Sequence, residues 1–496
     1  MKTASDKLFR LIKSMSPAEK RYFKRHYGSE SNVLTDIFDA INAQNIYDES
    51  SIKQSLSAKA AANFKVYKFQ LQQQVLQSLI SSGYFSTVGN KIRLGLEQAD
   101  ILAERNLIDM AIKQLEKTRQ LCYKYEEFPY LLEITAKKFR LKYAQTNLNT
   151  NIPEPSFEEH RRILETLLEL NQLTDLARQV GKLAKKWPDI DLKNQRLARE
   201  YRDHPLLQKK YPEAPIRSNF TILQILGNIT LVLGDTQQAK TYFKESVELF
   251  AKDKKLKQHF AFYYLLGLRR SITLAIHMRE IACASEQLNQ LNQFLGNDQQ
   301  YQSYQVFVVK SELQMAILTG GSYRTLPKLE QRASDLIRNY NLPEDIDLAK
   351  LYFLLASFCT VMHRYNEALD YLQMLSALDR NSRSHFCEVV NILEWVIFYE
   401  QDDLPKAKRK LGKMRQQYER DHPREHSILF SDILHLFQCL LTDKHKAPGQ
   451  AKELLKKIED TPGDQLAQQF HAICFQAWLQ GVIEAKAYRT VLAKAQ

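Results

Sequence analysis

Two short segments near the carboxyl end of the chain carry histidine and cysteine at spacings that suit a metal ion. His435 and Cys439 are four residues apart in "HLFQC", and His471 and Cys474 are three residues apart in "HAIC". Residues at these spacings share one side of a helix, and two histidines with two cysteines make a tetrahedral zinc set. The alternative interpretation, which we prefer, places all four residues in the core. We therefore expect no metal and no cofactor.

The common motifs of enzymes are missing from the sequence. It contains no GxxxxGK[ST], GxGxxG, HExxH or GxSxG pattern. The sequence therefore does not indicate a phosphate-binding loop, a zincin-type zinc site or a serine nucleophile on a sharp turn. Catalytic groups usually sit on loops, and the longer predicted loops, 147–156 and 202–218, hold turn residues and prolines without a catalytic set. We expect a protein that is not an enzyme and has no small-molecule substrate.

A basic helix is predicted at 17–27. Ser16 can cap it, Pro17 suits its first position, and Glu19 completes a capping box. Next to the aromatic residues of "YFKRHY", one face carries two pairs of basic residues at i, i+4 spacing: Lys20 with Lys24 and Arg21 with Arg25. Such a face could grip phosphates and stack on bases. The alternative, which we prefer, is an amphipathic helix with solvated charges.

The composition indicates helix almost throughout. Hydrophobic residues make up 44% and charged residues 26% of the 496 residues, which is ordinary for a globular protein. Gly (15) and Pro (14) are both scarce. A β-sandwich or barrel needs many more turns, so we expect an all-α fold.

Charge and cysteine usage bear on partners and compartment. The net charge of +13 makes an anionic partner such as nucleic acid an alternative to be weighed, although the excess is spread along the chain. Six widely spaced cysteines without a CxxC suit a reducing compartment. Charged residues break every apolar run at the N-terminus, and no run is long enough to span a bilayer. We expect a cytoplasmic protein without membrane contact.

Helical hairpins recur along the chain. In "LGDTQQAKTYFKESVELF" (233–250), a turn at Gly234-Asp235 leads into a helix with apolar residues four apart. Equivalent alanines are found in five segments: Ala111, Ala239, Ala368, Ala407 and Ala451. Their intervals of 128, 129, 39 and 44 residues fit multiples of about 42 residues. Further helical stretches fill the gaps: 130–147, 156–171, 173–186, 262–277, 281–295, 301–319 and 325–339.

The repeat suggests three divisions of the chain. Residues 1–90 do not fit the repeat and form an N-terminal helical domain, with helices at about 31–43, 49–56 and 59–82 and a possible small hairpin at 84–94. This domain is interpreted as the helical cap of the array. Residues 91–481 form the array of about nine helix pairs. A helix at 464–480 and a capping helix within 482–496 would close it.

One hairpin resembles the tetratricopeptide repeat. Its Leu-Gly at 226–227, turn Gly234, Ala239 and Phe243 follow that family's spacing, and "HRYNEALDYL" (363–372) is similar. The resemblance implies a right-handed α-solenoid of antiparallel helix pairs whose first helices line a concave surface. On that register the candidate partner-binding residues are Arg93, Asp100, Gln224, Asn228, Lys350, Phe353 and Ser357.

The expected function follows from this geometry. Asn228 resembles the asparagine with which some tetratricopeptide domains hold a peptide carboxylate, but Gln224 stands where the lysine is expected, so that clamp is not carried over. We expect a scaffold or adaptor that holds a protein or peptide partner in its groove. One alternative is a nucleic-acid-associated repeat protein or transcriptional regulator whose basic N-terminal helices contact phosphates. The other is an enzyme or metal protein that uses the histidine and cysteine set.

Overall fold

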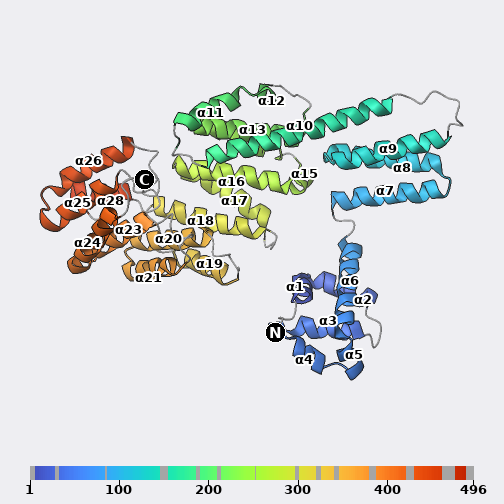
Figure 1. The fold of residues 1–496 in the computed structure, drawn as a ribbon, viewed down its shortest axis with the longest axis horizontal. Coiled ribbons are helices and arrows are strands. Elements are labelled where there is room, and N and C mark those ends of the chain that lie inside the picture. The colour runs from blue at the N-terminus through green and yellow to red at the C-terminus, as the bar shows by residue number, and fades with distance from the viewer. Residues whose placement is uncertain are drawn as a thin grey trace. The chain divides into compact units, whose positions relative to one another are not determined.

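The fold was analysed in a computed structural model of the chain. The structure describes residues 6–27, 33–83, 87–145, 155–185, 190, 192–208, 214–251, 253–296, 301–319, 326–339, 346–378, 387–420, 429–460 and 475–486. In these residues there are 26 helices and no strand (Figure 1). The chain is therefore all-α, as its composition predicts.

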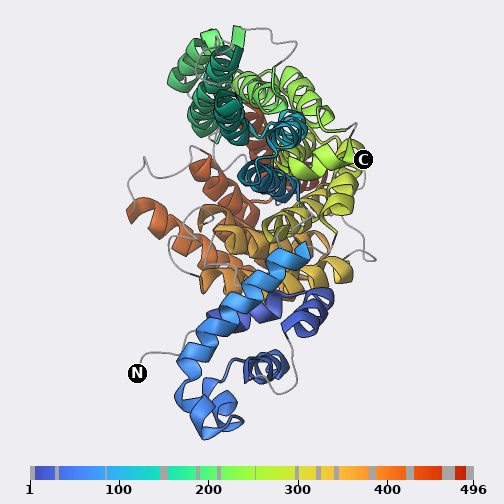
Figure 2. The same cartoon turned by 90° about the vertical axis from the view of Figure 1, so that its right-hand side faces the viewer.

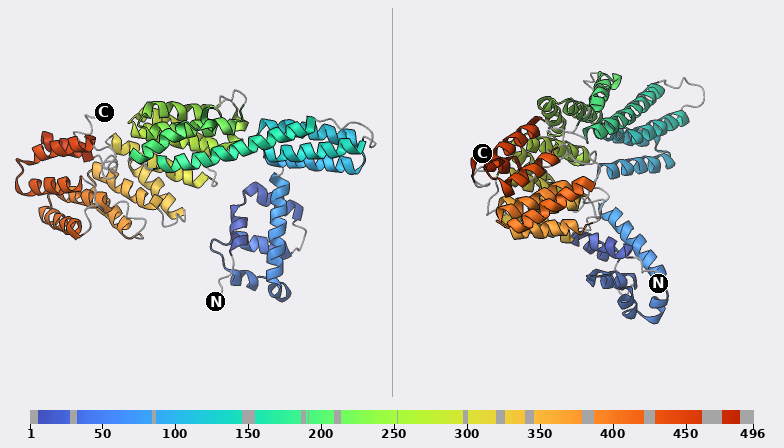
Figure 3. Two further views of the ribbon diagram at one scale, coloured as in Figure 1. Left: turned by 45° about the horizontal axis from the view of Figure 1, so that its top comes forward. Right: turned by 60° about the vertical axis from the view of Figure 1, so that its left-hand side comes forward.

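The chain divides into two compact units, residues 1–168 and 169–496. The first unit contains α1 (Lys7–Ser14), α2 (Pro17–Tyr27), α3 (Val33–Ala43), α4 (Glu49–Gln54), α5 (Ala58–Ala62), α6 (Phe64–Gly83), α7 (Val88–Glu104), α8 (Ile108–Lys124), α9 (Phe128–Gln145) and the first part of α10 (Pro155–Ala184). In this unit α7, α8 and α9 pack side by side (Figure 3).

The second unit holds the remaining helices, most of which pack on their neighbours in sequence. They are α11 (Leu192–Arg202), α12 (Pro205–Gln208), α13 (Ile216–Val232), α14 (Thr236–Glu248), α15 (Lys254–His259), α16 (Ala261–His277), α17 (Ile281–Leu295), α18 (Gln302–Leu318), α19 (Leu326–Asn339), α20 (Ile346–Val361), α21 (Tyr365–Ser376), α23 (Cys387–Glu400), α24 (Leu404–Arg420), α25 (Phe430–Thr442), α26 (Ala447–Asp460) and α28 (Phe475–Glu484). Adjacent helix pairs of this kind are compatible with a helical repeat.

Helix positions largely follow the apolar periodicity, with two corrections. The predicted hairpin at 84–94 is wrong, because Gly89 and Asn90 lie inside α7, whose N-cap Thr87 accepts a hydrogen bond from the N–H of Asn90 at 3.2 Å. The predicted break near residue 172 is also absent, since α10 is one continuous helix. The division at residues 90 and 481 stays a prediction. At the C-terminal boundary α28 runs through Val482, and residues 487–496 lie outside the described part.

The N-terminal helices α1–α4 and α6 share one apolar core. α6 lies alongside α2 and α3 (Figure 2), and Phe23 of α2 stacks on Phe38 of α3 with ring centroids 4.5 Å apart. The predicted capping box of α2 is confirmed. The Ser16 N–H donates to Glu19 Oε2 at 2.7 Å, and the Glu19 N–H donates to Ser16 Oγ at 3.3 Å. Burial of this core is the main source of stability for these short helices.

A cluster of polar side chains links α4 to α6. Glu49 accepts a hydrogen bond from Tyr47 at 2.9 Å and pairs with Lys68 at 3.0 Å and Lys53 at 2.9 Å. Partial burial alone would raise the pKa of Glu49, but these three donors outweigh it and lower the pKa to about 2. The cluster therefore favours the folded state at neutral pH.

The turn inside five helix pairs has one geometry. A residue with φ between 57° and 90° ends the first helix, and the next N–H donates 2.9 Å to the carbonyl of the residue five positions earlier, which is a Schellman motif. The five residues are Asn106, Gly234, Arg279, His363 and Asp402. Four of them are not glycine, although other residues adopt this left-handed conformation only at some cost in energy. The pairs are thus built on a common turn.

Small residues let the two helices of a pair approach closely. Ala111, Ala239, Ala284, Ala368 and Ala407 each lie five positions after the left-handed residue, and all are fully buried. Glycine does the same on the facing helix. A Cβ at Gly227 would lie 2.5 Å from Cε1 of Phe243, and a Cβ at Gly95 would collide with Thr118.

Replacing Gly227 with alanine is expected to lower the free energy of unfolding by about 1–3 kcal/mol, because the added methyl group overpacks the α13–α14 contact. The matched control is Gly412→Ala in α24, where nothing lies within 4 Å of the added Cβ. That variant is expected to gain up to about 1 kcal/mol from helix propensity. Urea unfolding followed by circular dichroism measures both, and equal changes in the two variants would contradict this packing.

The Glu49 cluster predicts a pH dependence of stability. Its carboxylate has a pKa lowered from 4.5 to about 2, so its stabilising contribution is complete above pH 4.5 and is lost as the pH falls toward 2. In Glu49→Gln this part of the acid sensitivity should disappear. Thermal unfolding between neutral and acidic pH tests it, with Glu104→Gln at an exposed position of α7 as the control. Parallel acid profiles for wild type and Glu49→Gln would refute the assignment.

Candidate functional site

A groove of about 440 Å³ runs along α7 and α8. Nine residues line it: Lys91, Leu94, Gln98, Gln114, Lys117, Thr118, Gln120, Leu121 and Lys124. Three lysines and three glutamines thus share one hollow with two leucines. Such a lining suits an anionic partner of mixed polarity.

The packing of α7 on α8 gives the groove its shape. Gly95 lets Thr118 approach the α7 backbone, and the buried Ala99 and Ala111 keep the helices close. Next to this contact, Gln114 Nε2 donates to Gln98 Oε1 at 2.9 Å and links the two walls. The position of the groove is therefore set by the same small residues that define the pair.

The groove lies on the side of the pair that faces away from α9. On α7, the contacts to α9 come from Arg93, which donates to Tyr130 at 3.0 Å, and from Asp100, which pairs with Lys137. Lys91 lies on another side of the same helix. The groove and the contacts to α9 therefore lie on different sides of α7.

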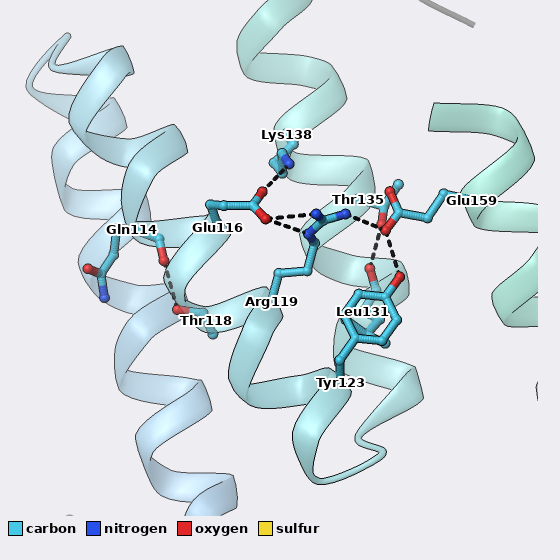
Figure 4. A network of polar contacts seen from close by, with 9 residues as sticks. All are labelled: Gln114, Glu116, Thr118, Arg119, Tyr123, Leu131, Thr135, Lys138 and Glu159. Carbon is cyan, nitrogen blue, oxygen red and sulfur yellow. Dashed lines mark hydrogen bonds and ion pairs between the residues drawn. The ribbon is translucent and has the colours of Figure 1, made fainter. Parts of the chain in front are cut away.

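The opposite side of α8 is occupied by a network of ion pairs (Figure 4). Arg119 bridges Glu116 and Glu159 at 2.7 and 2.6 Å, and Lys138 donates to Glu116 at 2.6 Å. Burial would raise the pKa of Glu116, but Lys138 and Arg119 outweigh it and lower the pKa. Figure 4 shows Gln114 on one side of α8 while Glu116 and Arg119 reach toward α9 and α10. Glu116 of α8 is thus neutralised on a side of the helix away from the groove.

The groove lysines are exposed. Within the described residues, Lys91 and Lys117 form no ion pair. Lys124 lies over the ring of Tyr125, with its Nζ 5.5 Å from the ring centroid. The charges of Lys91 and Lys117 therefore face solvent and can attract an anionic partner that enters the groove.

Four of the seven residues predicted for a concave binding face are buried instead: Gln224, Asn228, Phe353 and Ser357. Gln224 donates to Ser246 Oγ at 2.8 Å, and Ser357 Oγ donates to the carbonyl of Phe353 at 2.8 Å. The reason is that α13 packs against α11, α14 and α16, and α20 packs against α18, α19, α21 and α23. These four side chains belong to the interior.

The other three predicted residues are reachable in part. Arg93 and Asp100 are exposed and hold α7 to α9 through Tyr130 and Lys137. Lys350 on α20 is half-buried. The seven residues are divided between the two compact units, with Arg93 and Asp100 in the first and the other five in the second.

The predicted basic face of α2 is only partly available. Lys24 pairs with Asp39 at 2.6 Å, and Lys20 is half-buried. Arg21 and Arg25 are exposed. Phe23 is fully buried, so it cannot stack on a base.

The histidine and cysteine pairs give no metal site in the described part of the chain. His435 is exposed and Cys439 is buried, although both lie on α25, while His471 and Cys474 lie outside the described residues. Another group, Glu330, Cys359 and Glu367, brings ligand atoms within 4.8 Å of one another.

In this second group, Arg364 already pairs with both carboxylates. It donates to Glu330 at 2.9 Å and pairs with Glu367, so its guanidinium group balances both carboxylates. Burial, with the charge of Glu330, raises the pKa of the Cys359 thiol to about 12, and a metal ligand must be a thiolate. The arrangement is an ion-pair cluster between α19, α20 and α21.

Sequence reasoning missed the groove lysines. Lys117 and Lys124 are seven residues apart and share a side of α8, which is a visible signal, but it also fits a solvated face. Only the pairing with α7 brings Lys91 to the same hollow.

Comparisons with known proteins do not assign the chain to a group. No protein-family model matches it, and no curated protein matches it. Among the described helices, none is long and apolar enough to cross a membrane.

Zinc is expected to leave the melting temperature of the wild-type protein unchanged, because Arg364 occupies the space between Glu330 and Glu367. Arg364→Gln removes this cation and keeps all three ligand groups. That variant is expected to melt at a higher temperature when zinc is added, since binding stabilises the folded state. Zinc-dependent stabilisation of the wild type, with Glu330→Gln abolishing it, would contradict this assignment.

Proposed function

We propose that the protein is a non-enzymatic interaction scaffold that holds an acidic segment of a partner protein in the groove of α7 and α8. The observation that carries the proposal is the lining of this groove by three lysines and three glutamines around Leu94 and Leu121. The proposal also takes the helix pairs as a tetratricopeptide-like, right-handed array of about nine units in the cytoplasm.

The chemistry of the groove supports a peptide partner. The lysines attract carboxylates, the glutamine amides donate and accept hydrogen bonds along an extended backbone, and the leucines pack against apolar side chains. A nucleic acid offers the same negative charge. In the groove, however, the described lining holds no aromatic side chain on which a base could stack. The glutamines and leucines therefore favour a peptide over a nucleic acid.

The test uses the full chain and a labelled peptide of alternating glutamate and leucine, with binding read by fluorescence anisotropy. The matched peptide has glutamine in place of glutamate and should bind at least about tenfold more weakly. The double variant Lys91→Glu, Lys117→Glu is expected to lower the affinity for the acidic peptide by about tenfold or more, because it introduces repulsion in the groove.

Lys113→Glu is the control, because Lys113 is exposed on the same helix but does not line the groove. It should change the affinity less than the groove double variant does. Equal binding of the acidic and neutral peptides, or equal effects of the groove and control variants, would overturn the proposal. Tight binding of a single-stranded oligonucleotide that depends on Arg21 and Arg25 would favour the nucleic-acid alternative instead.

A further inference from the structure

The helix α16 carries two adjacent arginines that form no ion pair in the described part of the chain. Arg269 is exposed and Arg270 is half-buried. Three carboxylates on the elements packed against α16 have other partners: Glu248 pairs with Lys244, Glu280 with Lys240, and Glu312 with Arg332. The positive charges of the two arginines are therefore left without a counter-charge.

The guanidinium group of Arg270 is held in the fold at a cost. Burial lowers its pKa, and the positive charge of Arg269 lowers the pKa further. A partly buried charge of this kind destabilises the folded state unless an opposite charge accompanies it. Solvent still reaches the group, because none of its side-chain nitrogens is sealed off without a hydrogen-bond partner. The missing counter-charge can therefore be supplied by a bound anion.

The two arginines lie on different sides of α16, which is placed between α13 and α18 (Figure 1). Arg269 lies toward α18, where its Cζ is 5.4 Å from the centroid of the Phe307 ring. Arg270 lies toward α13. Seven residues earlier on the same side of α16, Tyr263 contacts Phe220 of α13 with ring centroids 5.3 Å apart. The two charges therefore lie where three helices of the second unit meet.

A third hydrogen-bond donor lies beside Arg269. Tyr304 stands one turn before Phe307 on α18, so it shares the side of that helix which Arg269 covers. Burial raises the pKa of Tyr304, and the positive charge of Arg269 opposes this effect, which places the phenol near the guanidinium group. Among the described residues, the Tyr304 hydroxyl group has no hydrogen-bond partner. Two guanidinium groups and one phenol are thus available in one region.

We propose that Arg269, Arg270 and Tyr304 bind a phosphate monoester. Arginine binds phosphate through two parallel N–H donors, and a monoester carries close to two negative charges and three acceptor oxygens. One such group neutralises both arginines and accepts a hydrogen bond from the phenol as well. A carboxylate carries a single negative charge, so it would leave one guanidinium group unpaired. This site is separate from the groove of α7 and α8 and does not depend on what that groove binds.

The test is isothermal titration calorimetry of the full chain with two probes, glycerol phosphate and a neutral peptide that contains one phosphoserine. Binding is expected, and the tighter probe identifies the source of the phosphate as a small molecule or a protein chain. The same peptide with aspartate in place of phosphoserine should bind about tenfold more weakly, because it offers one charge fewer. Arg270→Gln is expected to weaken phosphate binding by about tenfold or more, and Tyr304→Phe by about fivefold.

Arg415→Gln is the matched control, because it removes the same charge at an exposed position of α24. It should leave the affinity unchanged, and so should the groove double variant Lys91→Glu, Lys117→Glu. Circular dichroism checks that Arg270→Gln folds, and Tyr304→Phe, which loses only one oxygen atom, gives the same test independently.

Three results would each overturn the proposal. The first is that neither probe binds. The second is that the Arg270 and Tyr304 variants bind phosphate as tightly as the Arg415 control does. The third is that the aspartate peptide binds as tightly as the phosphoserine peptide. Loss of phosphate binding in the groove double variant would also contradict the site, because it would place the phosphate on α7 and α8.

Discussion

The close contact between the two helices of a pair is the interaction on which the rest of the structure depends. It requires a small residue at the contact and a left-handed residue in the turn. Gly227 faces Phe243 in one pair, and Arg279 adopts a φ of 58° in the next turn. Neither helix of a pair can bury its apolar face alone, so the contact decides which side chains become interior.

This constraint explains why residues taken for a binding face are buried. The tetratricopeptide register places Gln224 and Ser357 on the first helix of a pair, where an open superhelix would expose them. Here α13 and α20 each pack against at least three other helices. Their polar groups are satisfied internally, Gln224 by Ser246 and Ser357 by the carbonyl of Phe353. The position of a residue in the repeat pattern indicates on which face of its helix the residue lies. It does not indicate how many other helices cover that face.

The sequence predicts the helices well and their turns poorly, for one physical reason. Apolar periodicity over a dozen residues is strong evidence, and the stretch predicted at 281–295 coincides with α17. A turn depends on one residue, and only Gly234 among the five left-handed turn residues has the expected type. Conversely, Gly89 signalled a turn but lies inside α7. The groove could not be predicted from the sequence, because Lys91 and Lys117 line one hollow only after α7 has packed on α8.

The proposed binding groove lies on the helix pair α7 and α8, and its chemistry disfavours a second copy of itself. The groove on α7 and α8 is rimmed with lysines, so a second copy of the same groove would be repelled while an acidic peptide is attracted.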